Sequence, residues 1–188
     1  MGPYNTGLFE AGYDLVNAFH ETDCNAADVN GDYVKVRDFW KVGVLFIKGG
    51  AEDVDDLAIS LTQATSAAGG SAKALTAFYG ARGWYKSGAF TSQNTWTEWT
   101  EVTTADDAVA FGATVPAGST RVIADTGTTA LQIYTEFETT ALDADGAFDW
   151  LRVNALGSGN VNNACLISAW YVLIGNRYPQ KTPLTNIA

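Results

Sequence analysis

The chain has 188 residues, of which 47% are hydrophobic and 17% charged, so it can bury a real core as one domain and is not a disordered chain. Its formal net charge of −10 argues against nucleic acid as a partner, because phosphate binding needs clustered Lys and Arg and the eleven basic residues are scattered. No apolar run approaches the ~20 residues that cross a bilayer, and the first residues lack the pattern of a secretion signal. We expect a soluble protein with neither a membrane nor nucleic acid among its partners.

Residues 1–30 are predicted to form an irregular N-terminal arm. Aromatic residues are spaced along it, which suggests that the arm lies over a surface of this chain or of a neighbour. The candidate partner contacts in the arm are Tyr4, Phe9, Tyr13 and Phe19.

From residue 31 the sequence becomes a series of short apolar segments separated by clusters of Gly, Asp, Asn and Ser. The predicted strands are Tyr33–Arg37, Phe39–Ile47, Leu57–Ala64, Leu75–Tyr85, Thr95–Thr103, Thr120–Asp125, Leu131–Thr139, Phe148–Ala155 and Leu166–Ile174. Such spacing favours an all-β fold, a β-sandwich of the jelly-roll or immunoglobulin-like kind, over a barrel. We predict a jelly-roll-like β-sandwich over residues 31–178 and an extended C-terminal tail over residues 179–188.

The stretch from Asp55 to Tyr85 is the most informative part of this pattern. Leu57, Ile59 and Leu61 alternate with smaller residues, which is the two-residue period of a half-buried strand. A run of small residues containing two adjacent glycines follows, and then an aromatic-rich strand. We predict two strands joined by a flexible tip, which builds a rigid surface suited to binding and not to chemistry.

Residue types that carry catalysis are sparse. His20 is the only histidine, so a zinc site with several histidines cannot be assembled and any histidine-based triad would depend on this one residue. Glycosidase-type carboxylate pairs are harder to exclude, because the chain has 21 acidic residues. Four acidic residues lie on predicted strands, and an outward-facing position explains each of them without a catalytic role: Glu98, Glu136, Glu138 and Asp149. We therefore expect no catalytic residue and no enzyme activity.

Two loops, Asp28–Asp32 and Asp143–Gly146, place oxygen-bearing side chains around a glycine as calcium sites do. Neither has the full twelve-residue calcium loop with its terminal Glu, and Asn-Gly and Asp-Gly are also common pairs in tight turns. We interpret both loops as turns and expect no metal and no other cofactor, although calcium binding stays open.

Cys24 and Cys165 lie far apart in the sequence. They fit either two buried thiols or one disulfide, and thiols are favoured because Cys165 belongs to an apolar run.

Trp96 and Trp99 are further candidate partner contacts. They lie three residues apart on a predicted strand, so they face opposite sides unless a bulge intervenes. One is expected in the core and the other exposed, where a Trp can stack on a sugar or anchor a protein contact. Core packing is the expectation for Trp40, Trp150 and Trp170.

Three segments, DVDDLAISLTQATSAAGGSAKAL, LDADGAFDWLRV and AWYVLIGNRYP, resemble a group of small tailed-bacteriophage virion proteins. That group has the similar patterns TLxQATxxxGxxAKAL, LDxxxGFDxVRV and YxLxxxRY. The matching residues are Leu61, Gln63, Ala64, Thr65, Gly70, Ala72, Lys73, Ala74, Leu75, Leu142, Asp143, Gly146, Phe148, Asp149, Arg152, Val153, Tyr171, Leu173, Arg177 and Tyr178. The first fifty residues take no part in the resemblance.

The resemblance implies a structural protein of the phage particle, of the type that decorates or cements the capsid, while a minor head, fibre-base or tail component stays open. The implied partners are the major capsid protein and further copies of this chain, which would form a trimer or a dimer. Its location would be the virion, assembled in the host cytoplasm. No catalytic residue comes with it: Gln63, Lys73, Asp149 and Arg152 would be structural, through a buried Asp–Arg pair or a Gln bonded to a loop.

Two other classes of function stay open from the residues alone. A carbohydrate-binding module is suggested by a Trp-rich sandwich with two calcium-like loops, and would depend on Trp96 or Trp99. A small hydrolase is the weakest of the three, because the chain lacks a histidine-based set.

Overall fold

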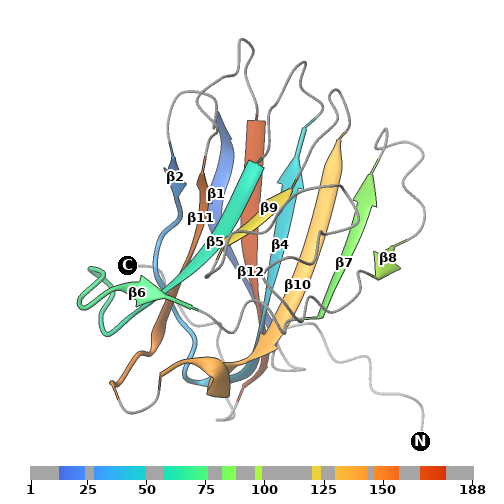
Figure 1. Cartoon of the computed structure of the whole chain (residues 1–188). Coiled ribbons are helices and arrows are strands. Elements are labelled where there is room, and N and C mark those ends of the chain that lie inside the picture. Colours follow the sequence, from blue (N-terminus) through green and yellow to red (C-terminus); the bar gives the residue numbers. More distant parts are fainter. Residues whose placement is uncertain are drawn as a thin grey trace, which may run out of the picture.

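The structure is a computed structural model that describes residues 13–23, 28–49, 57–75, 82–87, 96–98, 120–123, 130–143, 146–156 and 166–176. Within these ranges the chain is all-β, and two antiparallel sheets pack on each other as a β-sandwich (Figure 1). The described part contains no helix that is long and apolar enough to cross a membrane. One short 3-10 helix, η3, covers Thr139–Ala141.

Each sheet has six described strands, and the sheet with the longer strands, called here the first sheet, has the order β1-β12-β4-β10-β7-β8. Its strands are β1 (Tyr13–Asp23), β4 (Phe39–Lys48), β7 (Arg82–Ser87), β8 (Thr97–Glu98), β10 (Leu131–Glu138) and β12 (Leu166–Asn176). The last strand of the described residues therefore lies between two early strands, with β1 on one side and β4 on the other.

The second sheet has the order β2-β11-β5-β6, with β3 also paired to β11 and β9 also paired to β5. Its strands are β2 (Val29–Asn30), β3 (Val34–Lys35), β5 (Leu57–Ala64), β6 (Lys73–Ala74), β9 (Thr120–Ile123) and β11 (Trp150–Leu156). Along the chain, consecutive strands or strand pairs alternate between the two sheets. This alternation is compatible with the jelly-roll subtype, which stays a prediction.

The core lies between the sheets because alternate residues of each strand point inward. In β4, Val42, Val44 and Phe46 are at most 2% exposed, and in β5 the inward residues include Leu61 at 0%. These two-residue periods are the ones that predict the strands in the sequence. The predicted strands from Tyr33–Arg37 onward each overlap a described strand, and Leu57–Ala64 coincides with β5.

The prediction of an irregular arm over residues 1–30 is wrong for most of its second half. Residues 13–23 form β1, an eleven-residue strand paired to β12, and residues 29–30 form β2. The pairing of β1 shifts register on both sides of Phe19, so that Ala18 and Phe19 are buried in succession and the simple alternation is lost. Residues 1–12 lie outside the described residues.

The connection from β5 to β6 is a tightly hydrogen-bonded loop, whereas the sequence predicts a flexible tip. Thr65 N–H donates to the Gly70 carbonyl at 2.9 Å, and Gly70 N–H donates to Ser66 Oγ at 3.0 Å. Gly69 has a φ of +78°, and a Cβ there would lie 2.9 Å from the Tyr33 ring. Glycine is therefore required at this position by both backbone conformation and close packing. The aromatic strand β7 then joins the opposite sheet and does not pair with β5.

Tyr171 of β12 connects the two sheets through its hydroxyl. The side chain is fully buried, and its hydroxyl donates to the Asp32 carbonyl and accepts from the Val153 N–H, both at 2.9 Å. Gly31 N–H donates to the Val153 carbonyl beside it. Burial raises the pKa of the Tyr171 hydroxyl well above its ordinary value, so the group is a neutral bridge between strands.

Several sequence predictions fall outside the described residues and have no structural account. They concern Tyr4, Phe9, Cys24, Trp99, Cys165 and the C-terminal tail over residues 179–188.

Candidate functional site

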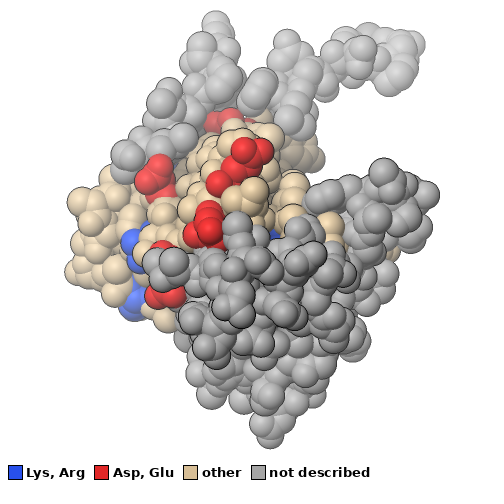
Figure 2. All heavy atoms as spheres, turned by 90° about the horizontal axis from the view of Figure 1, so that it is seen from above, with Lys and Arg blue, Asp and Glu red and all other residues tan. Residues whose placement is uncertain are grey.

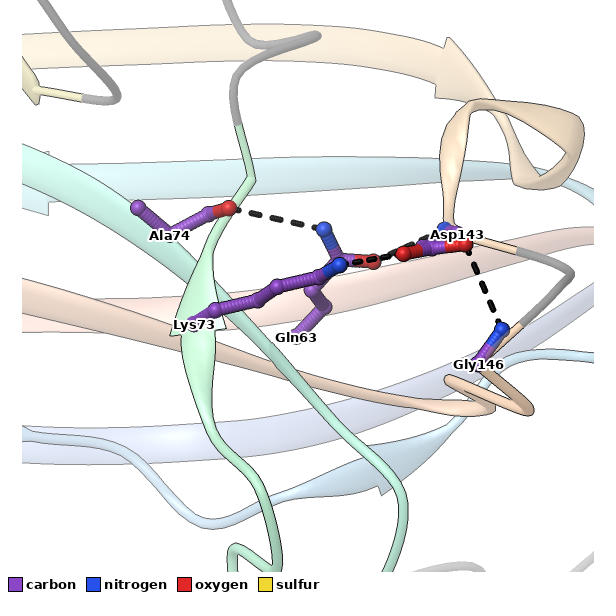
Figure 3. A network of polar contacts seen from close by, with 5 residues as sticks. All are labelled: Gln63, Lys73, Ala74, Asp143 and Gly146. Carbon is purple, nitrogen blue, oxygen red and sulfur yellow. Dashed lines mark hydrogen bonds and ion pairs between the residues drawn. The ribbon is translucent and has the colours of Figure 1, made fainter.

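Two of the segments that carry the virion-protein resemblance contact each other through Gln63, Lys73 and Asp143 (Figure 3). The Gln63 carboxamide, on a residue only 5% exposed, accepts from the Asp143 N–H at 2.9 Å and donates to the Ala74 carbonyl at 3.4 Å. Lys73 on β6 forms an ion pair with the Asp143 carboxylate, and its ammonium lies 4.3 Å from the centre of the Phe148 ring. These contacts join β5, β6 and the loop before β11, as expected for a Gln bonded to a loop.

The Asp143 carboxylate also accepts from Gly146 N–H at 3.3 Å, and Phe148 N–H donates to the Asp143 carbonyl at 3.2 Å. The segment is therefore hydrogen-bonded as a turn. At the other calcium-like loop, Gly31 N–H and the Asp32 carbonyl are engaged with the neighbouring strands. Within the described ranges, no group of three or more His, Cys, Asp or Glu residues is placed to hold a metal ion.

The Asp–Arg pair expected from the resemblance joins Asp149 to Arg37 and does not involve Arg152. Asp149 accepts from Arg37 with both carboxylate oxygens at 3.2 Å, and the Arg37 side chain is 63% exposed, so this pair is not buried. Arg152 instead places its guanidinium 4.9 Å from the centre of the Tyr33 ring. A largely exposed pair contributes about 0–1 kcal/mol, so its role is local positioning of the loop before β11.

His20 lies in the bulge of β1, beside Ser168 and Glu21. Its Nδ1 is 3.5 Å from Ser168 Oγ, and its Nε2 is 3.8 Å from the Glu21 carboxylate. Both distances exceed the ~2.6–3.2 Å reach of a general base, and Ser168 Oγ accepts from the Glu21 N–H at 2.9 Å. The contacts of His20 are therefore those of a residue in the bulge of an edge strand, and not those of a general base.

The outer side of the first sheet carries a band of aromatic and aliphatic side chains, which we call the aromatic face. Its members are Leu15, Leu45, Trp84, Trp96, Tyr134, Trp170 and Val172. The strand register places Trp170, Leu45, Tyr134 and Trp84 opposite one another in a row across β12, β4, β10 and β7. Leu15 on β1 is 50% exposed and Trp96 is 39% exposed. Apolar side chains that occupy one continuous outer face are typical of a contact surface.

A groove of about 490 Å³ opens on the aromatic face, lined by Leu45, Trp84, Trp96, Tyr134 and Val172. The Trp84 and Tyr134 rings are stacked with their centres 5.8 Å apart. Among the side chains that line the groove, the polar atoms are the Tyr134 hydroxyl and the two indole N–H groups. The groove is therefore suited to an apolar group.

Gly43 gives the groove its shape. It faces outward from β4, and a Cβ there would lie 2.6 Å from Cε2 of Tyr134. Because a real Cβ cannot approach that closely, only glycine lets the Tyr134 ring lie down across β4. The ring thereby forms part of the floor of the groove.

The polar groups beside the groove have partners. The Tyr134 hydroxyl donates to Glu136 at 3.3 Å, and the other Glu136 oxygen lies 3.7 Å from the Lys41 ammonium. Burial, and secondly the Glu136 carboxylate, raise the pKa of Tyr134 to about 12. Lys86 places its ammonium 4.6 Å from the centre of the Trp96 ring. The tyrosine is thus neutral at physiological pH, and the neighbouring carboxylate is paired with a cation.

The predicted partner contacts are only partly brought together. Tyr13 is 37% exposed on β1, and Trp96 lines the groove. Phe19 is 8% exposed and packs edge-on against Phe46 in the core, so its prediction as a partner contact is wrong. The expectation that Trp40 and Trp170 pack in the core is also wrong, because Trp40 is 59% exposed and Trp170 lies on the outer side of the first sheet opposite Leu45.

Sequence reasoning missed most of the groove, namely Leu45, Trp84, Tyr134 and Val172. The alternation along β10 does place Tyr134 on the opposite side from Ile133 and Thr135, so the outward position of Tyr134 was available as a signal. Its neighbours on β4, β7 and β12 come from distant parts of the chain and depend on the sheet order.

No protein-family model matches the sequence, and no curated protein matches it. The crystal structure of the SPBc2 prophage-derived protein YomS is similar over 85% of this chain and 94% of that chain, at 11% identity and a TM-score of 0.36. The structure of infectious bursal disease virus Gx strain is similar over 87% of this chain and 40% of that chain, at 10% identity and a TM-score of 0.17. Both TM-scores are too low to carry an argument about fold or function.

Proposed function

We propose that this chain is a structural protein of a bacteriophage particle, a capsid decoration or cement protein that acts by protein–protein contact and without catalysis. The observation that carries the contact role is the aromatic face, where Leu15, Trp96 and the apolar groove lie exposed on one side of a rigid sheet. Aromatic residues in an apolar groove are the usual anchors of protein interfaces.

Assignment to a phage particle is supported by the sequence resemblance. The resembling residues Gln63, Lys73 and Asp143 form one contact network, so the motif corresponds to a structural unit that fixes the sandwich. A motif of this kind indicates that the chain shares its structural scaffold with the proteins that it resembles. The resemblance therefore supports a role in the phage particle and does not by itself point to one contact within it. The major capsid protein is the proposed partner, and the virion is the proposed location.

The charge distribution suits a shell surface. The chain carries a net charge of −10, and the end of the sandwich seen in Figure 2 shows more acidic than basic side chains among its described residues. Such a charge keeps free subunits soluble and repels packaged nucleic acid. Many copies on a shell make a weak single contact sufficient, because their contacts add through multivalency.

The test uses particles from a phage deleted for this gene. Purified protein is added to the undecorated heads, bound protein is measured by sedimentation, and cryo-EM locates it. We expect saturable binding, density on the outer shell, and greater resistance of the heads to heat. Absence of binding at saturating protein, or density confined to the tail, would overturn the decoration role.

A carbohydrate-binding module is the second candidate, because Trp84, Trp96 and Tyr134 line one groove. Aromatic rings can stack on sugars, although the groove offers few polar groups for sugar hydroxyls. Calorimetric titration with polysaccharides decides between the two: affinity that is lost on Trp96→Ala would favour this candidate over decoration.

A further inference from the structure

We propose that the aromatic face is the docking surface for a second copy of this chain, with the two copies packed face to face about a two-fold axis. The inference rests on the proposed function, in which this face is a protein-contact surface, and adds the identity of one partner.

The face has a projecting side and a hollow side. Leu15 stands on β1 at one edge of the first sheet, 50% exposed, while Trp84 on β7 and Trp96 beside β8 line the groove toward the other edge (Figure 1). A two-fold axis parallel to the strands, above the middle of the sheet between β4 and β10, places β1 of one copy over the β7–β8 side of the other. Each copy then brings its Leu15 to the partner's groove, which is the reciprocity of an isologous interface.

The size of the face is what a stable dimer needs. The four strands of eight or more residues run ~27 Å or longer, β7 runs ~20 Å and β8 runs ~7 Å. At a width of ~4.8 Å per strand, they give a flat footprint of roughly 650 Å². Side chains that project from the sheet add to this flat area, so the surface of the face approaches the ~800 Å² that each partner contributes to a standard interface.

The charges next to the groove also fit a like partner. Each copy carries a net charge of −10, so two copies repel one another at a distance. Within the described residues at the groove, Glu136 is paired with Lys41 at 3.7 Å, and Lys86 lies against the Trp96 ring. Docking therefore buries the Glu136 carboxylate together with its cation. Salt screens the overall repulsion between the two copies and should strengthen the dimer. A basic partner would show the opposite salt dependence.

The experiment is sedimentation analysis of the full chain over a wide concentration range at low and high salt. We expect a dimer that tightens as salt rises. Leu15→Glu places a charge in the apolar interface and should weaken the dimer by at least about tenfold. Trp96→Ala, which removes a groove wall, should weaken it as well. The matched control is Ala72→Glu, which places the same charge on an exposed residue of the loop between β5 and β6 in the second sheet, away from the aromatic face.

Circular dichroism establishes that each variant is folded. A wild-type chain that stays monomeric at all concentrations would overturn the inference, as would folded Leu15→Glu and Trp96→Ala variants that dimerise normally. A trimer would overturn the two-fold arrangement. The head-binding assay separates this inference from the proposed function: a monomer that decorates heads refutes only the dimer, whereas a dimer that binds no heads refutes only the decoration role.

Discussion

Replacing Tyr171 with Phe removes one hydroxyl from the point where the two sheets are joined. That hydroxyl accepts from the Val153 N–H and donates to the Asp32 carbonyl, both at 2.9 Å, on a fully buried side chain. Phe fills the same space but leaves the Val153 N–H buried without an acceptor, while the Asp32 carbonyl is partly buried and can turn to water. One unsatisfied buried group costs about 1–3 kcal/mol, and we expect the free energy of unfolding to fall by that amount.

Urea unfolding followed by tryptophan fluorescence measures this change as a lower midpoint at an unchanged slope. In a domain of this size each kcal/mol lowers Tm by about 2–4 °C. The control is Tyr13→Phe, because Tyr13 is 37% exposed and its variant should stay within about 0.5 kcal/mol of the wild type. A loss for Tyr171→Phe no larger than that of the control would refute the bridging role.

The same substitution has a pH signature. The pKa of Tyr171 in the folded chain lies well above the ordinary value of 10.0, because burial disfavours the phenolate. The folded state therefore binds the proton more tightly than the unfolded state. Its contribution is complete below pH 10 and is lost as the pH rises beyond that value. We expect the stability gap between the wild type and Tyr171→Phe to narrow at alkaline pH, and a constant gap would count against this reasoning.

Gln63→Leu leaves the Asp143 N–H without its acceptor and should lower the free energy of unfolding by about 1–3 kcal/mol, measured by urea unfolding; an unchanged midpoint would show that this contact is not formed. Gly43→Ala forces a Cβ into the Tyr134 ring and should cost about 1–3 kcal/mol. The cost should shrink in a Tyr134→Ala background, and a double-mutant cycle showing equal costs would contradict that packing. Ultraviolet titration should find the Tyr134 pKa near 12, so its contribution to stability is present below pH 10 and lost between there and pH 12. Glu136→Gln should lower this pKa, and an unchanged value would exclude the carboxylate as a cause.

The strands were predictable because an inward-facing residue at every second position produces a local alternation of apolar and polar residues in the sequence. Ile59 and Leu61 show this pattern clearly in β5, and the sandwich follows from many such strands. The bulge around Phe19 interrupts this alternation in β1, since two successive residues turn inward there and the two-residue period is lost. An arm was therefore predicted where a strand exists.

The candidate site was less accessible to sequence reasoning because it is made by long-range pairing. Alternation marks Tyr134 as outward-facing, but only the sheet order brings Leu45 and Trp84 beside it. Gly43 within an apolar run was a usable sign of close approach by another group. The Gln63 contact with a loop was foreseen, whereas the partner of Asp149 was not, because nothing local points to Arg37.

The position of β12 between β1 and β4 has a consequence for synthesis. Both neighbours leave the ribosome long before residues 166–176 are made, so each must wait with an unpaired edge until β12 arrives. The first sheet therefore cannot be completed before β12 has emerged, and such late pairing of segments that are distant in the sequence is of the kind that slows folding. Until then the apolar residues of β4 stand exposed on an open edge, which makes the interval before β12 emerges the period of greatest exposure to aggregation and to chaperones.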